Sequence, residues 1–323
     1  MRVALDAEPL TLTSGGLKRY VEELTKALRT EYPQDDYLYL PEPRSFLERR
    51  WWLYGAERAS AKAAVDVFHG TNFSIPFFTK RPTVLTLHDL SPWRDAKWHG
   101  SAAAARIRRR TPYLLPRATH IITPSEAIRA EAMTRFRISA HRITAIPLAA
   151  SRHFRPQPER VPSYFLFVGT LEPRKGLTML LEAWRATGKT VPLRVAGRMR
   201  ADFLPIAPEH NLELLGEVPD AALPALYTNA VAVIYPSEYE GFGLPVLEAM
   251  QCGANVITSC DAALMELTGD AALHVSTVQE LHAALTSTCD TAARRSCAVA
   301  RAAQYSWKLT AQRTHAIYEE VTR

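Results

Sequence analysis

Short apolar runs rich in β-branched residues alternate with helical patterns along the chain. In the first half these runs lie at residues 3–7, 65–70, 83–89 and 119–125. Strand patterns that alternate with helix patterns are typical of βαβ units, which build parallel sheets. The pattern therefore predicts an α/β protein with a doubly wound sheet in its first half.

The same rhythm starts again after a stretch rich in proline and arginine at residues 152–162. Such a stretch is typical of a linker between domains. We therefore expect two Rossmann-like domains, an N-terminal one over residues 1–155 and a C-terminal one over residues 156–305. Apolar residues on a helical pattern near the end of the chain predict a further helix over residues 306–323.

Length and composition fit this division. A chain of 323 residues exceeds what one hydrophobic core usually serves, and 47% hydrophobic with 22% charged residues argues against disorder. No run approaches the roughly 18 apolar residues of a membrane span, and Asp6 and Glu8 interrupt the first apolar run. The four cysteines form no C-x-x-C pair, which favours a reducing compartment. We expect a cytoplasmic protein.

The net charge of +6 hides an asymmetry between the two halves. Residues 1–158 hold 25 Lys and Arg against 15 Asp and Glu, whereas the remainder holds 14 against 18. A basic half attracts anionic lipid, nucleic acid or a phosphorylated acceptor, and charge alone does not choose among them.

The segment YPSEYEGFGLPVLEAM at residues 235–250 carries the strongest chemical signal. A strand pattern ends at Tyr235, and a helix pattern starts near Leu244 after a loop interrupted by glycines. In open α/β sheets, ligands bind beyond the carboxyl ends of strands, where a helix N-terminus offers free amide donors. Glu240 and Glu248 can both face such a crevice, and carboxylates accept hydrogen bonds from neighbouring hydroxyls. The segment predicts a site for a hydroxyl-rich ligand that carries an anion.

This segment resembles the E-x7-E signature of the family 4 retaining glycosyltransferases, from Glu240 to Glu248 with G-F-G-L-P between them. The resemblance implies GT-B architecture, in which two Rossmann-like domains face a cleft and the helix at 306–323 crosses back to the N-terminal domain. It also implies that Glu248 holds the ribose hydroxyls and Glu240 the sugar hydroxyls. Four further residues of the segment are expected at the donor: Gly241, Phe242, Gly243 and Leu244.

Two adjacent cations, Arg174 and Lys175, follow another strand pattern and precede a helix that opens after Gly176. Arginine can grip phosphate bidentately and lysine acts as a point charge, so such a pair suits a diphosphate. Taken alone, such a pair is more often a solvated charge pair in a surface turn. The family resemblance implies that both cations neutralise the departing nucleotide diphosphate and that Gly169 also lies at the donor.

Two further motifs lie in the first half of the chain. Gly15 and Gly16 open a helix after the first strand pattern and resemble the family's N-terminal glycine loop, although an ordinary loop could carry the same pair. His88 and Asp89 end another strand pattern. A lone histidine there is more often a structural hydrogen-bonding group, but the resemblance places His88 beside the donor sugar as a catalytic group. Asp89 is expected to orient the loop.

The segment at residues 215–230 resembles the family's base-binding turn, in which backbone groups near Val218 meet the nucleobase. Many glycosyltransferases of other folds hold a divalent metal with an Asp-x-Asp motif, which this sequence lacks. The resemblance therefore implies metal-independent chemistry, with Arg174, Lys175 and helix amides stabilising the diphosphate. The family is thought to retain the anomeric configuration by front-face attack, with the leaving phosphate accepting the acceptor's proton.

Donor and acceptor follow only from the overall likeness to bacterial surface-polysaccharide mannosyltransferases. We expect GDP-mannose as the donor and a UDP-sugar as the alternative, with a saccharide or lipid-diphosphate-linked acceptor and no further cofactor. Residues 48–55 and 106–117 combine arginines with tryptophan or tyrosine, as membrane-interface surfaces do. They suggest peripheral contact with an anionic membrane, and a solvated helix face with buried tryptophans is an equal alternative.

Three other functions are alternatives for such a chain. A nucleotide-sugar epimerase would act on the donor without an acceptor, and a phosphorylase would need a longer chain and a lysine placed for pyridoxal phosphate. A nucleic-acid-binding protein would fit the basic half, but the sequence carries no recognised binding motif. We expect no nucleic acid as a partner.

Overall fold

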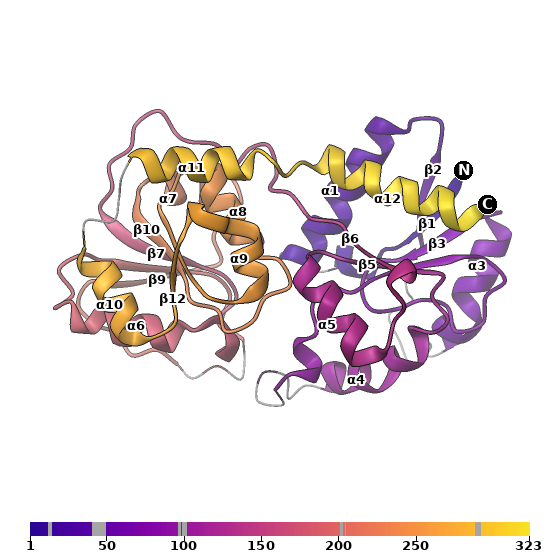
Figure 1. Ribbon diagram of the computed structural model, residues 1–323, viewed down its shortest axis with the longest axis horizontal. Coiled ribbons are helices and arrows are strands. Elements are labelled where there is room, and N and C mark those ends of the chain that lie inside the picture. Colours follow the sequence, from indigo (N-terminus) through magenta and orange to yellow (C-terminus); the bar gives the residue numbers. More distant parts are fainter. Residues whose placement is uncertain are drawn as a thin grey trace. The chain divides into compact units, whose positions relative to one another are not determined.

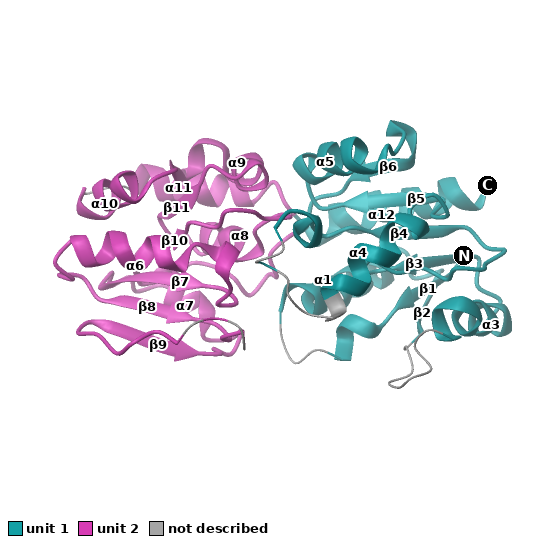
Figure 2. Cartoon of the chain, turned by 90° about the horizontal axis from the view of Figure 1, so that it is seen from below, with its two compact units in different colours: residues 1–148, 306–323 teal, residues 149–305 magenta. Residues whose placement is uncertain are grey.

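The chain folds into two units, Met1–Leu148 with Ser306–Arg323 and Ala149–Tyr305 (Figure 2). The computed structural model describes residues 1–11, 15–40, 50–95, 98, 102–200, 203, 205–287 and 292–323. Cys289 lies outside these ranges.

The first unit is built on a six-stranded sheet of order β2-β1-β3-β4-β5-β6, in which every pairing is parallel. Its strands are β1 (Arg2–Asp6), β2 (Asp36–Leu40), β3 (Val67–Gly70), β4 (Thr83–Thr86), β5 (His120–Thr123) and β6 (Ile143–Ala145). Its helices are α1 (Gly16–Glu31), η2 (Trp51–Gly55), α3 (Ala56–Lys62), α4 (Ala102–Leu114), α5 (Glu126–Phe136) and α12 (Trp307–Thr322), with short 3-10 turns η1 (Glu8–Thr11), η3 (Ser91–Trp93) and η4 (Ala140–Arg142).

The four apolar runs of the first half contain β1, β3, β4 and β5, whose residues are almost all buried. The sequence did not predict β2 and β6, which lie at the two edges of the sheet. In β2 only Tyr37 is buried, so the segment lacks the continuous apolar run of a central strand. The second unit repeats the parallel architecture, and the predicted α/β fold is confirmed.

The final helix, α12, packs against α1 of the first unit (Figure 1). Its Tyr318 hydroxyl lies 2.6 Å from Nδ1 of His69 on β3, and its Thr310 hydroxyl donates to the Pro147 carbonyl at 2.8 Å. Nε2 of His315 lies 2.7 Å from a carboxylate oxygen of Asp35. These buried polar contacts fix the end of the chain on the same unit as its beginning.

The second unit holds a parallel sheet of order β12-β11-β10-β7-β8-β9. Its strands are β7 (Tyr164–Val168), β8 (Leu193–Ala196), β9 (Leu212–Gly216), β10 (Ala230–Tyr235), β11 (Val256–Ser259) and β12 (Leu273–Val275). Its helices are α6 (Leu177–Ala186), α7 (Leu223–Thr228), α8 (Leu244–Gln251), α9 (Ala262–Thr268), α10 (Val278–Thr286) and α11 (Ala292–Ala302), with 3-10 turns η5 (Pro173–Lys175) and η6 (Gly269–Ala271).

Read from β9, this order is the 3-2-1-4-5-6 arrangement of the Rossmann fold. Helices α6 and α10 pack together on one face of the sheet, while α7, α8 and α11 lie on the other (Figure 1). The strand order reverses between β7 and β10, and ligands in such sheets bind beyond the carboxyl ends of the strands at that switch point.

The boundary between the units follows Leu148, whereas the sequence predicted it after residue 155. The segment in between belongs to the second unit because it packs there. Phe154 is fully buried with its ring 6.1 Å from that of Tyr227, and the Gln251 amide donates to the Phe154 carbonyl at 2.6 Å. The high content of proline and arginine indicated a linker. Composition does not reveal these packing contacts.

Candidate functional site

The switch point of the second unit is occupied by two turns, η5 after β7 and the loop after β10. Gly176, which ends η5, has φ 69°, and a Cβ built on it would lie 1.9 Å from the Pro236 carbonyl oxygen. Only glycine therefore lets the two turns approach so closely. The Glu238 amide donates to the Arg174 carbonyl at 2.7 Å, which ties the turns together.

Lys175 and Glu240 form a buried ion pair between these turns. Nζ of Lys175 lies 2.6 Å from Oε1 of Glu240 and donates to the Tyr235 hydroxyl at 2.7 Å. Lys175 is 7% exposed and Glu240 6%. Removing one member of such a pair would leave an uncompensated buried charge, so the two residues depend on each other.

Arg174 joins this pair from the same turn. Its Nη1 donates to the Tyr239 carbonyl at 2.7 Å and lies 3.4 Å from Oε2 of Glu240. Its Nε lies 2.8 Å from Oε1 of Glu172. The three residues that the sequence proposed for catalysis in this unit, Arg174, Lys175 and Glu240, are thus brought together.

The two cations keep Glu240 ionised. Burial alone would raise the pKa of this carboxyl, but the positive charges of Lys175 and Arg174 outweigh it and lower the pKa to about 2. At neutral pH the carboxylate can therefore accept hydrogen bonds and cannot donate one.

Glu248 belongs to α8, the helix that follows the loop after β10. It is buried on α8, where it accepts a hydrogen bond from the Tyr227 hydroxyl at 3.2 Å. The helix opens after Gly243, which has φ 99° and would meet a Leu264 side-chain carbon at 2.6 Å if it carried a Cβ.

The other residues proposed for the donor site differ in their contacts and in their burial. The Phe242 ring packs edge-on against Tyr305, and Leu244 is buried at the start of α8, so both side chains serve packing. Gly169 follows β7 and donates its amide to the Ala196 carbonyl at 2.9 Å. Gly241 lies in the loop before Gly243, within the buried segment.

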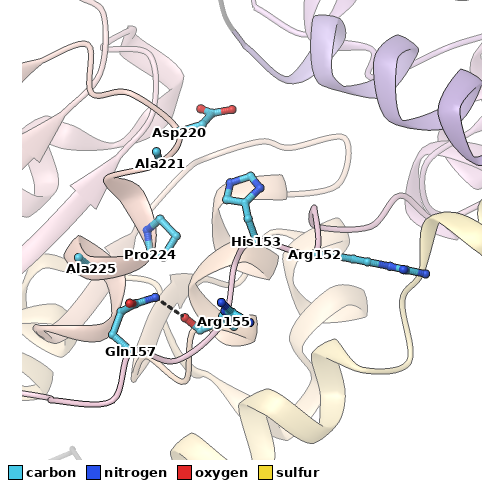
Figure 3. Close-up of a pocket in the computed structure, with 8 residues that line it drawn as sticks. All are labelled: Arg152, His153, Arg155, Gln157, Asp220, Ala221, Pro224 and Ala225. Atoms are coloured by element: carbon cyan, nitrogen blue, oxygen red, sulfur yellow. Dashed lines mark hydrogen bonds between the residues drawn. The ribbon is translucent and has the colours of Figure 1, made fainter.

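Val218 lies half-buried in the connection between β9 and α7. The same connection borders an open cavity of 580 Å³ (Figure 3). Its lining comes from the linker and from the start of α7: Arg152, His153, Arg155, Gln157, Asp220, Ala221, Pro224 and Ala225. The cavity therefore adjoins the turn predicted to meet the nucleobase.

The first unit holds the remaining proposed residues. Gly15 has φ 112° and precedes α1, whose first residue is Gly16, while residues 13 and 14 of the predicted glycine loop lie outside the described ranges. Asp89 accepts hydrogen bonds from the Ser91 amide and hydroxyl at 2.9 and 2.6 Å, so it orients the loop.

His88 is held by its neighbours in a defined tautomer. Its Nε2 lies 2.7 Å from the Thr71 carbonyl oxygen, which can only accept, so Nε2 carries the proton. Its ring packs edge-on against Tyr20 at 4.8 Å. Burial lowers the pKa of His88, so the ring is neutral near pH 7, with Nδ1 left as its acceptor.

Sequence reasoning missed two charged residues of the cluster, Glu172 and Arg200. Nη1 of Arg200 lies 3.0 Å from Oε2 of Glu172. Glu172 stands in the same motif as Arg174 and could have been noticed there. Arg200 follows β8, and only the pairing of β7 with β8 reveals that it is a neighbour.

The two aromatic and basic segments of the first unit lie side by side. The Arg110 guanidinium lies 5.2 Å from the Trp52 ring, and Tyr54 stacks on Phe78 at 5.5 Å. Trp52 is buried, whereas Tyr54, Phe78 and Tyr113 are 63%, 51% and 65% exposed. Residues 48 and 49 lie outside the described part of the chain.

The described ranges contain no group of three His, Cys, Asp or Glu side chains placed to hold a metal ion. None of their helices combines the length and the apolar character needed to cross a membrane.

Comparisons with known proteins agree with this architecture. The chain matches the family described as Glycosyltransferase Family 4 over residues 14–151 and the family described as Glycosyl transferases group 1 over residues 151–297. It is 35% identical to O-antigen chain mannosyltransferase B of Escherichia coli over 230 residues, which cover 64% of this chain and only 60% of that relative.

Solved structures give the fold over nearly the whole chain. HepE of Anabaena, in complex with UDP and glucose, is 17% identical with a TM-score of 0.74, over 98% of this chain and 99% of that one. Sucrose-phosphate synthase of Thermosynechococcus elongatus is 18% identical with a TM-score of 0.78, over 99% and 98%. At these identities the likeness supports the fold alone.

Proposed function

Because the chain belongs to the group 1 and family 4 glycosyltransferases, we propose that it transfers a hexose from a nucleoside-diphosphate sugar to an acceptor with retention of anomeric configuration. One observation carries the proposal. Arg174, Lys175 and Glu240 form a buried cluster at the topological switch point of the second unit, where Rossmann-like sheets bind phosphorylated ligands.

In the proposed reaction the bond between the anomeric carbon and the diphosphate breaks, and negative charge grows on the departing phosphate. Lys175, Arg174 and the amides at the start of α8 stabilise that charge without a metal ion. The leaving phosphate takes the proton of the attacking acceptor hydroxyl. Because these groups are already fixed by buried contacts, they need no rearrangement at the moment of reaction.

Glu240, kept ionised by the two cations, accepts hydrogen bonds from the sugar hydroxyls. Glu248 holds the ribose hydroxyls, and backbone groups near Val218 meet the base. His88, whose ring is neutral, meets the donor sugar and helps to polarise it. These roles remain proposals drawn from the family resemblance.

We propose GDP-mannose as the donor, supported by the relative that is named as an O-antigen mannosyltransferase. A UDP-sugar is the second candidate, supported by a structural relative solved with UDP and glucose. The acceptor is a saccharide or a lipid-diphosphate-linked saccharide of a surface polysaccharide. The exposed aromatic residues beside α4 support peripheral contact with an anionic membrane.

A thermal-shift panel of GDP, UDP and ADP with their sugars tests the proposal. The matching nucleotide should raise the melting temperature in a concentration-dependent way, because a ligand that binds only the folded state stabilises it. The stabilising sugar nucleotide is then incubated with and without acceptor, and the product's anomeric configuration is read by NMR. Stabilisation by none of them, or conversion of the donor in the absence of an acceptor, would contradict the proposed transfer.

A further inference from the structure

Five charged side chains alternate in sign across the carboxyl ends of three adjacent strands of the second unit. Arg200 binds Glu172 at 3.0 Å, and Glu172 binds Arg174 at 2.8 Å. Arg174 then approaches Glu240 at 3.4 Å, and Glu240 binds Lys175 at 2.6 Å. The series begins after β8, passes through the turn after β7 to Glu240 in the loop after β10, and returns to the turn after β7 at Lys175, so it spans the switch point.

Backbone hydrogen bonds between the segments that follow β7 and β8 fix the position of Arg200. Beyond the ends of β7 and β8, Leu171 and Met199 continue the parallel pairing as an isolated bridge. The Leu171 amide donates to the Arg198 carbonyl at 2.9 Å, and the Arg200 amide donates to the Leu171 carbonyl at 3.1 Å. These bonds hold Arg200 beside the turn after β7 that carries Glu172 and Arg174.

Glu172 acts as a bridge between two guanidinium groups. It is 7% exposed, and each of its carboxylate oxygens contacts a different arginine. The side chain of Arg174 is 12% exposed and that of Arg200 24%, so Arg200 is the more accessible of the two. A buried carboxylate that holds two cations fixes both in position.

The series places three cationic side chains at one end of the sheet, and Arg200 is the most accessible of them. A diphosphate that links a nucleoside to a sugar brings two negative charges. A partly accessible guanidinium held in position at the edge of this site can donate hydrogen bonds to such an anion.

We propose that Arg200 is a third cation of the donor's diphosphate site and that Glu172 is a positioning residue that holds Arg200 and Arg174 in place. The proposal rests on the proposed function, because it assigns the same site a phosphorylated donor. It adds a binding residue that lies outside the motif of Arg174 and Lys175.

Arg200→Gln tests the first part. Calorimetric dissociation constants are measured for GDP, GMP and guanosine, and for the uridine series, with the full chain. Loss of a charge-assisted contact should weaken the bound diphosphate roughly 10- to 100-fold and leave the nucleoside unchanged. Arg200→Lys should recover part of the loss. Arg185→Gln, at an exposed pair with Glu209 near the end of α6, is the matched control and should bind like wild type.

The outcomes separate the two proposals. If wild type binds neither GDP nor UDP, the proposed function fails and this inference fails with it. If wild type binds one of them and Arg200→Gln binds it equally, only the role of Arg200 is overturned. An equal loss for nucleoside and diphosphate would mean a general disturbance of the unit and would also overturn it.

Glu172→Gln tests the positioning role. If Glu172 acts through the arginines, its effect on diphosphate affinity should not add to that of Arg200→Gln in the double variant, whereas independent sites add. Additive losses, or a lower melting temperature with unchanged diphosphate affinity, would show that Glu172 is structural only.

Discussion

At the residue scale, the site is defined by buried charges that neutralise one another. Lys175, Arg174 and Glu240 were identifiable from the sequence because they stand in two short motifs with a recognisable spacing. Arg200 was not, since no local pattern links it to Glu172 and the neighbourhood arises only from strand pairing. Charged partners that are distant in sequence cannot be assigned before the strand order is known.

Lys175→Ala should abolish transfer and also lower the free energy of unfolding by about 3 kcal/mol, because it leaves Glu240 buried with only part of its neutralising charge. Urea denaturation and a transfer assay would measure both effects. Lys189→Ala, at a more exposed pair with Glu209, serves as the control and should cost under about 1 kcal/mol. Transfer at the wild-type rate by Lys175→Ala would exclude the role given to this lysine.

The lowered pKa of Glu240 predicts a pH dependence. Its pKa falls from 4.5 to about 2 on folding, so the ionised carboxylate contributes stability that is fully present above about pH 4.5 and is lost as the pH falls toward 2. Relative to Glu240→Gln, wild type should therefore lose on the order of 3 kcal/mol over that range. Parallel stability curves for the two proteins in acid would contradict this.

At the element scale, continuous apolar runs predicted the central strands. Edge strands that are short or half polar were not predicted from the sequence. Strand β12 has three residues and β2 buries only Tyr37, so neither gives a clear pattern. The turns matter as much as the strands, because Gly176 lets the turn after β7 meet the loop after β10. Its conformation could not be read from the sequence, where a glycine after two cations has several explanations.

Gly176→Ala should destabilise the protein and weaken nucleotide binding, since the added methyl group would lie 1.9 Å from the Pro236 carbonyl oxygen and force apart the turns that hold the cluster. Gly188→Ala is a matched control, with a similar φ of 75° and nothing within 4 Å of its Cβ. The control should cost about 1 kcal/mol from backbone strain alone. Equal effects of both variants on nucleotide affinity would contradict the role of this close approach.

At the scale of the whole molecule, the chain divides its chemistry between two units. The second carries the ion cluster, and the first carries the basic, aromatic surface beside α4. The sequence predicted both units and the charge asymmetry. It placed the boundary between the units too far along the chain, because composition does not reveal how Phe154 packs. It also left open which aromatic residues of the basic surface are exposed.

Peripheral membrane contact predicts salt-sensitive co-sedimentation with anionic vesicles and little with neutral ones. Replacing the exposed Tyr54, Phe78 and Tyr113 by serine should reduce this binding, because aromatic side chains insert at the interface. Met265→Ser, an exposed apolar residue on α9 of the other unit, is the control. Equal, negligible binding to both vesicle types by wild type would contradict membrane contact.

The most direct test of the central claim is a crystal structure of the protein with the nucleoside diphosphate that stabilises it. The account predicts a phosphate oxygen within about 3 Å of Lys175 Nζ or of an Arg174 nitrogen, with the nucleotide beyond the carboxyl ends of β7 and β10. A nucleotide bound elsewhere, with both side chains out of reach of its phosphates, would contradict it.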